Sequence, residues 1–308
     1  MKTTLFPVIA IILVSLLGQM QAQEVKNTAP ALHDRVRIDS AYSPALQRVK
    51  RFVVMLPVNY DSTRRNHYPV LYLLHGWGGG SLDWATKTRL HAYASTANVL
   101  IVMPRAENSW YVNSATNATI RYEDYTAHDL PKHVATSFPA ADTTQQAIAG
   151  LSMGGYGAVM LALKHPQKYR FAASFSGAVT MPRDLGIREG WNKAAGGNNG
   201  DFTLPSLMDA FGKAGNPSRR ESDVFTLLSR YRASDSVTKA ALPYFYITTG
   251  IQDPLRTIVP GNRELRDTLY SLRLHYEYHE TPGKHNWAYW DEAVRDFLRR
   301  LVELSGWK

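Results

Sequence analysis

The middle of the chain consists of short, continuous runs of apolar residues separated by polar segments rich in glycine and proline. Runs of this kind predict strands that are buried on both faces, as in a parallel sheet. Helical spacing of apolar residues predicts helices between several of these runs. The alternation of strands and helices predicts an α/β fold. We expect buried strands at 70–74, 99–103, 147–151, 171–175 and 245–249, and helices at 122–138, with an interruption at Pro131, 154–164 and 286–304.

Four further segments complete the predicted fold. Residues 35–40 and 51–56 have strand patterns joined by a proline-containing turn, which predicts an antiparallel start to the sheet. Residues 276–280 alternate as one more strand. Between residues 179 and 241 the pattern weakens, which predicts an insertion that acts as a lid or a substrate wall. We therefore expect one α/β domain with a mostly parallel central sheet, flanking helices and an insertion at 179–241.

The first 22 residues have the pattern of a signal peptide. Lys2 gives a positive start, residues 5–17 are almost wholly apolar, and the small residue Ala22 ends a short polar stretch. A membrane anchor is the alternative, but the apolar stretch contains Pro7 and is shorter than the ~20 residues that a membrane-spanning helix needs. We expect residues 1–22 to be removed on export, leaving a single domain at 23–308 that is periplasmic or extracellular and has no stable membrane anchor.

The composition argues against several classes of function. With 44% hydrophobic and 20% charged residues among 308, the chain can form a large core. Its formal net charge is +9, but Lys and Arg are scattered, so we expect a solvated surface and no nucleic-acid partner. Cysteine is absent, which excludes disulfides and thiolate catalysis. His128 and His133 are five residues apart, a poor spacing for a shared metal ion, so we expect neither a metal nor a cofactor.

The strand at 147–151 leads into a Gly-x-Ser-x-Gly pentapeptide centred on Ser152. This pattern is typical of a nucleophile elbow, in which a strand turns sharply into a helix and the serine hydroxyl is exposed at the turn. Gly150 and Gly154 suit so tight a turn because a side chain there would clash. The alternative is a glycine-rich turn without chemistry. Ser152 is the candidate nucleophile.

A serine nucleophile needs a base and a group that orients the base, and both occur downstream. Asp253 lies in the loop after the strand at 245–249, where a carboxylate projects from the carboxyl end of the strand. His285 lies in the loop after the strand at 276–280. The resulting order of Ser152, Asp253 and His285 is characteristic of α/β-hydrolases. Asp253 is the candidate acid, and His285 is the candidate base.

The strand at 70–74 is followed by His-Gly-Trp-Gly-Gly-Gly at residues 75–80. Such a loop supplies one oxyanion-hole amide in lipases and esterases, because glycines let the main chain approach the substrate carbonyl. We expect the backbone N–H groups of Trp77 and Met153 to bind the oxyanion. For the His75 side chain we expect only local hydrogen bonds that stabilise the loop.

Three aromatic residues are candidates for substrate contact. Trp110 and Tyr111 lie in a loop that could border the site, and Trp287 closely follows His285. Aromatic rings in such positions can stack on a sugar or a phenolic ring. Packing against the edge of the core is an equally good interpretation of the loop aromatics.

Four motifs together resemble the esterase D-like family, which includes feruloyl and acetylxylan esterases, tributyrin esterases, S-formylglutathione hydrolases and mycolyltransferases. They are Leu-His-Gly-Trp-Gly-Gly at 74–79, Gly-Leu-Ser-Met-Gly-Gly-Tyr at 150–156, Gly-Ile-Gln-Asp at 250–253 and Pro-Gly-Lys-His-Asn-Trp-Ala-Tyr-Trp at 282–290. The likeness extends over most of residues 35 to 305. It implies that Ser152, Asp253 and His285 correspond to the family's nucleophile, acid and base, and that the amides of Trp77 and Met153 match its oxyanion hole. Lys284 departs from the common Gly-Gly-His form of the last motif.

The sequence therefore predicts a secreted serine carboxylesterase that forms an acyl-enzyme at Ser152. Export favours esters attached to polymers, so we expect acyl or feruloyl esters of carbohydrates as substrates. Two alternatives stay open at this stage. An acyltransferase would use the same triad, and a non-catalytic carbohydrate-binding protein could retain the hydrolase scaffold. The oligomeric state is left undetermined.

Overall fold

The computed structural model describes residues 32–65, 67–185 and 204–307. The predicted signal peptide and its boundary at residue 22 lie outside the described residues. The same holds for residues 186–203, which belong to the predicted insertion.

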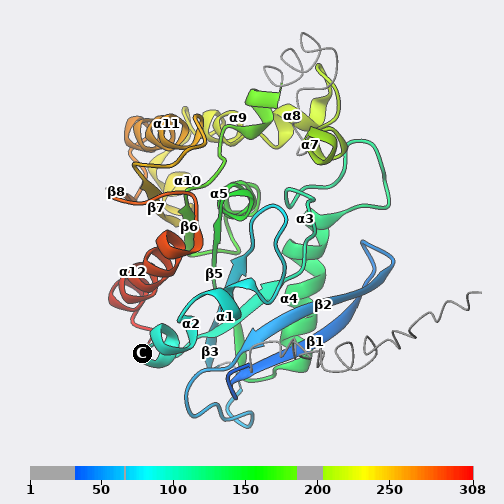
Figure 1. Cartoon of the computed structure of the whole chain (residues 1–308), viewed down its shortest axis with the longest axis vertical. Coiled ribbons are helices and arrows are strands. Elements are labelled where there is room, and N and C mark those ends of the chain that lie inside the picture. Colours follow the sequence, from blue (N-terminus) through cyan, green and yellow to red (C-terminus); the bar gives the residue numbers. More distant parts are fainter. Residues whose placement is uncertain (1–31, 66, 186–203, 308) are drawn as a thin grey trace, which may run out of the picture. The chain divides into compact units, whose positions relative to one another are not determined.

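An eight-stranded sheet, in the order β1-β2-β4-β3-β5-β6-β7-β8, forms the centre of the described chain (Figure 1). β1 and β2 pair antiparallel, as do β2 and β4, and all the remaining pairs are parallel. The predicted fold class, a mostly parallel sheet with an antiparallel start, is confirmed. The strands are β1 (Val36–Ser43), β2 (Arg48–Met55), β3 (Tyr68–Leu74), β4 (Leu100–Pro104), β5 (Ala141–Leu151), β6 (Phe171–Phe175), β7 (Tyr244–Gly250) and β8 (Tyr276–Thr281).

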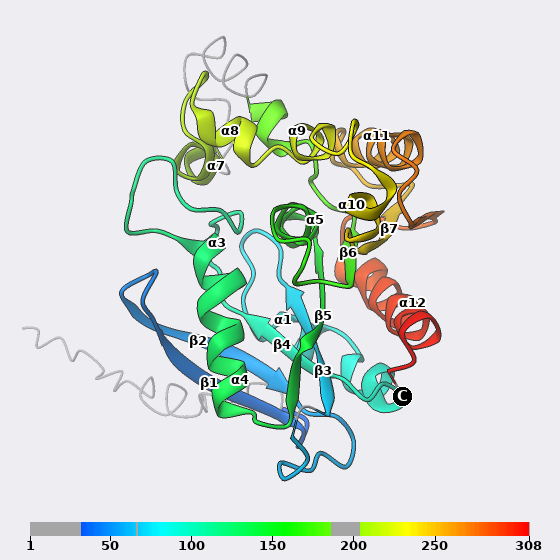
Figure 2. The ribbon, with the colours of Figure 1, turned by 180° about the vertical axis from the view of Figure 1, so that it is seen from behind.

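Helices cover both faces of this sheet, and each strand contributes alternate side chains to the two cores. In β3, Val70 and Tyr72 belong to one apolar cluster, and Leu71 and Leu73 belong to the other. The first cluster lies under α4 (Leu130–Ser137), α5 (Met153–Lys164), α9 (Val224–Ser229) and α11 (Ile258–Ser271). The second lies under α1 (Asp83–Lys87), α2 (Leu90–Tyr93) and α12 (Trp287–Ser305), which Figure 2 shows from behind. Both faces of the central strands are therefore apolar, as the continuous runs predict.

The helix predicted at 122–138 is interrupted, but not at the proline itself. It consists of α3 (Tyr122–Asp124), a π-helical segment Tyr125–Asp129, and α4, in which Pro131 occupies the first turn. Proline lacks an amide hydrogen, and its ring clashes with the carbonyl of the preceding turn. The irregular turn consequently lies on the N-terminal side of Pro131.

The predicted insertion lies between β6 and β7. Its described part includes the short helices α7 (Leu204–Phe211), α8 (Pro217–Glu221), α9 and α10 (Ser236–Ala240). The Tyr156 hydroxyl of α5 donates to the Ser222 carbonyl at 2.7 Å, which ties this segment to the helix that follows the nucleophile. The insertion is thus anchored beside the site.

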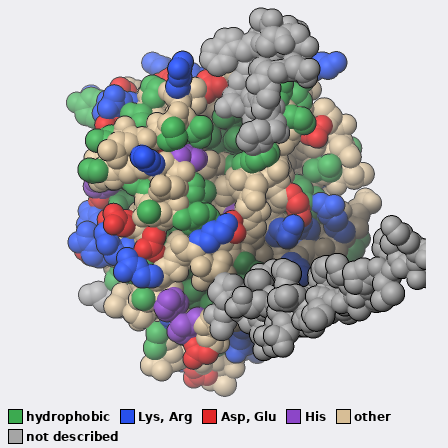
Figure 3. Space-filling model, in the orientation of Figure 1, with side chains coloured by type: hydrophobic (Ala, Val, Ile, Leu, Met, Phe, Trp, Pro, Cys, Tyr) green, Lys and Arg blue, Asp and Glu red, His purple; other side chains and the backbone are tan. Residues whose placement is uncertain are grey.

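Within the described residues, the structure contains no helix with the length and apolarity required to cross a membrane. On the face drawn in Figure 3, Lys and Arg side chains are interspersed with Asp and Glu. This face therefore presents mixed charge among its described side chains.

Candidate active site

Ser152 lies in the sharp turn between β5 and α5 that the pentapeptide predicts. Its backbone has φ 52° and ψ −115°, a left-handed conformation that costs a residue with a side chain about 1–3 kcal/mol. A Cβ added at Gly150 would lie 2.5 Å from the main chain of Gly154, and one at Gly154 would lie 2.6 Å from the Leu74 carbonyl. The two glycines are therefore required by close approach of the main chain.

Ser152, His285 and Asp253 form one continuous line of hydrogen bonds at the carboxyl ends of the parallel strands. His285 Nε2 lies 2.9 Å from Ser152 Oγ, and His285 Nδ1 lies 2.6 Å from Asp253 Oδ2. The Asp253 side chain has no exposed surface, and that of His285 is 13% exposed. An ionised carboxylate can only accept, so Nδ1 carries a proton and Nε2 is left as an acceptor for the serine hydroxyl. Lys284, where the sequence departs from the family pattern, is exposed and leaves this geometry in place.

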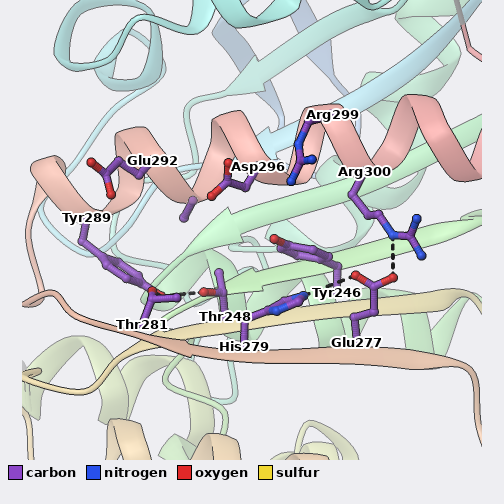
Figure 4. A pocket seen from close by; sticks show the side chains of 11 residues that line it. Tyr246, Thr248, Glu277, His279, Thr281, Tyr289, Glu292, Asp296, Arg299 and Arg300 are labelled. Atoms are coloured by element: carbon purple, nitrogen blue, oxygen red, sulfur yellow. Dashed lines mark hydrogen bonds and ion pairs between the residues drawn. The ribbon is translucent and has the colours of Figure 1, made fainter.

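The loop that carries His285 is supported by Tyr289 from the first turn of α12. Gly283 packs on the Tyr289 ring so closely that a Cβ would overlap with it. The Tyr289 hydroxyl lies 2.6 Å from Thr248 Oγ1, at the end of a cavity of about 200 Å³ between α12 and the edge strand β8 (Figure 4). The triad residues are not part of that cavity. Tyr289 therefore supports the His285 loop through its contact with Gly283.

The loop after β3 passes directly beside the nucleophile. A Cβ at Gly76 would lie 3.5 Å from the Ser152 Cβ. The buried His75 side chain accepts from the Ala106 amide at 3.0 Å through Nε2, and its Nδ1 lies 2.8 Å from the Gly76 carbonyl. Burial lowers the pKa of His75, which favours the neutral ring that this pattern needs. The prediction that His75 stabilises the loop locally is confirmed.

Two residues that the sequence analysis did not select also hold this loop. Asn108 Oδ1 accepts from the Gly78 amide at 2.7 Å, and Ser206 Oγ accepts from the Trp77 indole at 2.9 Å. Met153 is the first residue of α5, where amides have no partner inside the helix and the helix dipole favours negative charge. That the amides of Trp77 and Met153 bind the oxyanion remains a prediction.

The loop aromatics are packing residues, the alternative interpretation given above. Tyr111 is completely buried, and its hydroxyl donates to the His75 carbonyl at 2.9 Å. Trp110 is 4% exposed and packs edge-on against Tyr156. Rings this deeply buried offer no face on which a substrate could stack, so Trp110 and Tyr111 contribute packing and not substrate contacts. Trp287 is partly exposed beside His285 and packs edge-on against Trp84, so it stays a candidate.

Among the described residues, no group of three or more His, Cys, Asp or Glu side chains is arranged to hold a metal ion. The described site brings together the Ser152 hydroxyl, the His285 imidazole and the main chain of the loop after β3. This combination suits acyl transfer.

Comparison with known proteins gives the same assignment. Residues 43–301 match the sequence model of the family described as "Putative esterase". The chain is 24% identical over 271 residues to an acetyl esterase of Caldicellulosiruptor saccharolyticus, covering 86% of this chain and 97% of that one. It resembles the solved structure of FphF, a fluorophosphonate-binding serine hydrolase of Staphylococcus aureus, with 25% identity, a TM-score of 0.71 and coverage of 87% and 98%. A ferulic acid esterase of Anaeromyces mucronatus, solved with ferulic acid, shares the fold at 16% identity, a TM-score of 0.56 and coverage of 86% and 89%. The chain thus belongs to the esterase family of α/β-hydrolases, within its esterase D-like branch, and is a carboxylic ester hydrolase.

Proposed function

We propose that the protein is an exported serine carboxylesterase that hydrolyses acyl or feruloyl esters of carbohydrates through Ser152, His285 and Asp253. The catalytic part of this proposal rests on two contacts of His285, at 2.9 Å to Ser152 Oγ and at 2.6 Å to Asp253 Oδ2. This arrangement lets one proton move between Ser152 and His285 while Asp253 fixes the imidazole.

In the first half-reaction, Ser152 Oγ attacks the ester carbonyl carbon, and His285 Nε2 accepts the hydroxyl proton. The negative charge that develops on the carbonyl oxygen is bound by the amides of Trp77 and Met153. The bond between the carbonyl carbon and the alcohol oxygen then breaks, and His285 returns the proton to the departing alcohol. The product of this step is an ester of Ser152.

In the second half-reaction, water attacks the Ser152 ester, and His285 again accepts the proton. The carbonyl carbon then releases Ser152 Oγ, which takes the proton back from His285. One water molecule is consumed, and a carboxylic acid and the free enzyme are produced. Asp253 stabilises the imidazolium that forms twice in this cycle.

The substrate class is supported by two lines of argument. The relative that aligns along 97% of its own length is called an acetyl esterase, which supports a small acyl group. Residues 1–22 have the composition of an export signal, and an exported esterase meets esters that are attached to polymers. Sequencing the N-terminus of the protein recovered from the cell envelope or medium tests export, and an intact Met1 in a cytoplasmic fraction would contradict it.

Labelling with a fluorophosphonate probe, followed by peptide mapping, tests the catalytic assignment. We expect a single label on Ser152, and we expect Ser152→Ala to lose both the label and the hydrolysis of 4-nitrophenyl acetate while its thermal unfolding stays close to that of the wild type. Ser271→Ala, which removes an exposed hydroxyl at the end of α11, is the matched control and keeps both properties. A label on another residue, or full activity in Ser152→Ala, would refute the proposal.

A further inference from the structure

A cavity of about 220 Å³ lies next to the predicted oxyanion loop, because Asn108 and Ser206 line the cavity and also bind that loop. The nucleophile follows β5, which has β3 and β4 on one side and β6, β7 and β8 on the other. Asp253 and His285 come from the second side, after β7 and β8. The cavity is lined by the start of β2, the loop after β4, the start of α3, and α7 of the insertion. Its strand β2 and the loop after β4 belong to the side of the sheet that contains β3 and β4.

Two of its lining residues also hold the predicted oxyanion loop. Asn108 accepts from the Gly78 amide, and Ser206 accepts from the Trp77 indole. The cavity therefore shares a wall with the loop that passes beside Ser152. A substrate bound at the nucleophile reaches the cavity only with a part that lies several bonds from the ester, because the Trp77 loop lies between them.

The chemistry of the lining favours a neutral, hydroxyl-rich ring. Val112, Ile120 and Ala210 form an apolar wall suited to the C–H face of a sugar. Arg48 and Asp209 bring a cationic donor and an anionic acceptor to the same cavity. A fatty chain would leave these polar groups without partners, which is costly, and a charged ligand would meet a like charge at one end.

Several polar atoms are available for such a ring. Among the described residues, the Asn108 amide nitrogen donates to no group, and one carboxylate oxygen of Asp209 accepts from none. Arg48 is held in place by its hydrogen bond to the Tyr122 hydroxyl at 2.5 Å. An amide donor, a carboxylate acceptor and a fixed guanidinium can pair with neighbouring hydroxyl groups of one pyranose.

The Glu107 carboxylate also lines the cavity, and its charge is already paired. Both of its oxygens bind Lys50 Nζ, at 2.5 and 2.6 Å, and it also contacts the Tyr122 hydroxyl. Lys50 is 4% exposed, so this ion pair is part of the frame and is not free to bind a charged ligand. The part of the lining that Glu107 and Tyr122 form is therefore preformed, which lowers the entropy cost of binding.

We propose that this cavity is a subsite for one sugar ring of the oligosaccharide or polysaccharide that carries the ester. The proposal rests on the proposed function, since it assigns the alcohol part of the same substrate. A chain of sugars that passes the nucleophile extends beyond the esterified unit, and a ring further along that chain occupies the cavity.

The test compares two substrates with the same acetyl group, 4-nitrophenyl acetate and acetylated β-1,4-xylo-oligosaccharides. Asp209→Ala removes the carboxylate, and Ile120→Trp fills the cavity. In each variant we expect the ratio of kcat/KM for the oligosaccharide to kcat/KM for the nitrophenyl ester to fall by about tenfold. Asp267→Ala, which removes an exposed carboxylate from α11, is the control and keeps the wild-type ratio.

Each other outcome overturns one specific claim. An unchanged ratio in both variants, or a wild type that cleaves the nitrophenyl ester but not the oligosaccharides, refutes the subsite and leaves the esterase assignment standing. A changed preference between acetyl and butyryl nitrophenyl esters means that the cavity holds the acyl group, and also refutes it. A wild type that cleaves no ester and takes no fluorophosphonate label refutes the proposed function itself. If Asp209→Ala fails to fold, the ratio of the two kcat/KM values in Ile120→Trp alone decides whether the subsite exists.

Discussion

Removing the Tyr111 hydroxyl tests whether the oxyanion loop depends on the loop after β4. This hydroxyl donates to the His75 carbonyl at 2.9 Å inside the core, where Tyr111 has no exposed surface. The main chain of Tyr111 has a φ of 58°, and its ring packs against Gly157 of α5. Tyr111→Phe keeps this packing and removes only the hydrogen bond that fixes the first residue of the oxyanion loop.

The expected effect follows from the loss of one buried bond. The variant loses a net ~1 kcal/mol of hydrogen bonding, and the His75 carbonyl is left without this donor, which brings the total loss of unfolding free energy to about 2 kcal/mol. For a domain of this size the melting temperature then falls by about 4–8 °C. Removing an oxyanion donor outright lowers kcat by about 10²–10³, and here the donor is displaced and not removed. We therefore expect kcat to fall by about tenfold, with little change in KM.

The assay is steady-state hydrolysis of 4-nitrophenyl acetate together with a thermal melt of each variant. Tyr125→Phe is the matched control, because the Tyr125 hydroxyl is buried and bonds to no other described residue. We expect this control to keep its activity and to be as stable as the wild type or more stable. A Tyr111→Phe variant that melts earlier but keeps kcat within twofold of the wild type would refute the reasoning, since the oxyanion loop would then hold its position without this bond.

Two further predictions concern the triad and the response to pH. Asp253→Asn should lower kcat by on the order of 10⁴-fold, measured with the same ester, because the amide favours the wrong tautomer of His285. Wild-type activity in this variant would mean that another carboxylate holds His285, yet Glu280 is bound to Arg263 and Asp129 to Ser43. Burial lowers the pKa of His75 in the folded protein below its value in the unfolded chain. The neutral His75 side chain therefore contributes its full stabilisation above pH ~6.5, and this stabilisation is lost as the pH falls through the pKa of His75 in the folded protein. We expect the melting temperature to decline below pH ~6.5 and His75→Gln to reduce that slope, and equal slopes in the two proteins would contradict this.

The sequence was sufficient to predict those parts of the site whose geometry depends on residues close together in the chain. Gly150 and Gly154 flank Ser152 because the main chain approaches itself within a few residues, and such a constraint is visible as a short pattern. The continuous apolar runs likewise predicted the central strands, since both faces of each strand are covered. The order of the motifs then placed the candidate acid and base after later strands of the same sheet.

The roles of the surrounding residues depend on contacts between distant segments, which no local pattern contains. Ser206 meets Trp77 across 129 positions of sequence, and nothing in its neighbourhood distinguishes it from other serines. Trp110 and Tyr111 have φ values of 57° and 58°, which turn the rings into the core although both lie in a loop. An aromatic residue in a loop has the same sequence pattern whether it faces substrate or core.

These contacts also separate the parts of the site that can vary from the parts that cannot. Ser152 and Asp253 follow β5 and β7, and His285 follows the edge strand β8, so the positions of all three depend on the sheet. The described part of the insertion reaches the site from outside the sheet, through Ser206 on the Trp77 indole. Changes in α7 can therefore reshape the wall beside the oxyanion loop while the hydrogen bonds of the triad keep their length. In a fold whose function resides in grafted sites, this arrangement lets substrate preference change without loss of the hydrolytic chemistry.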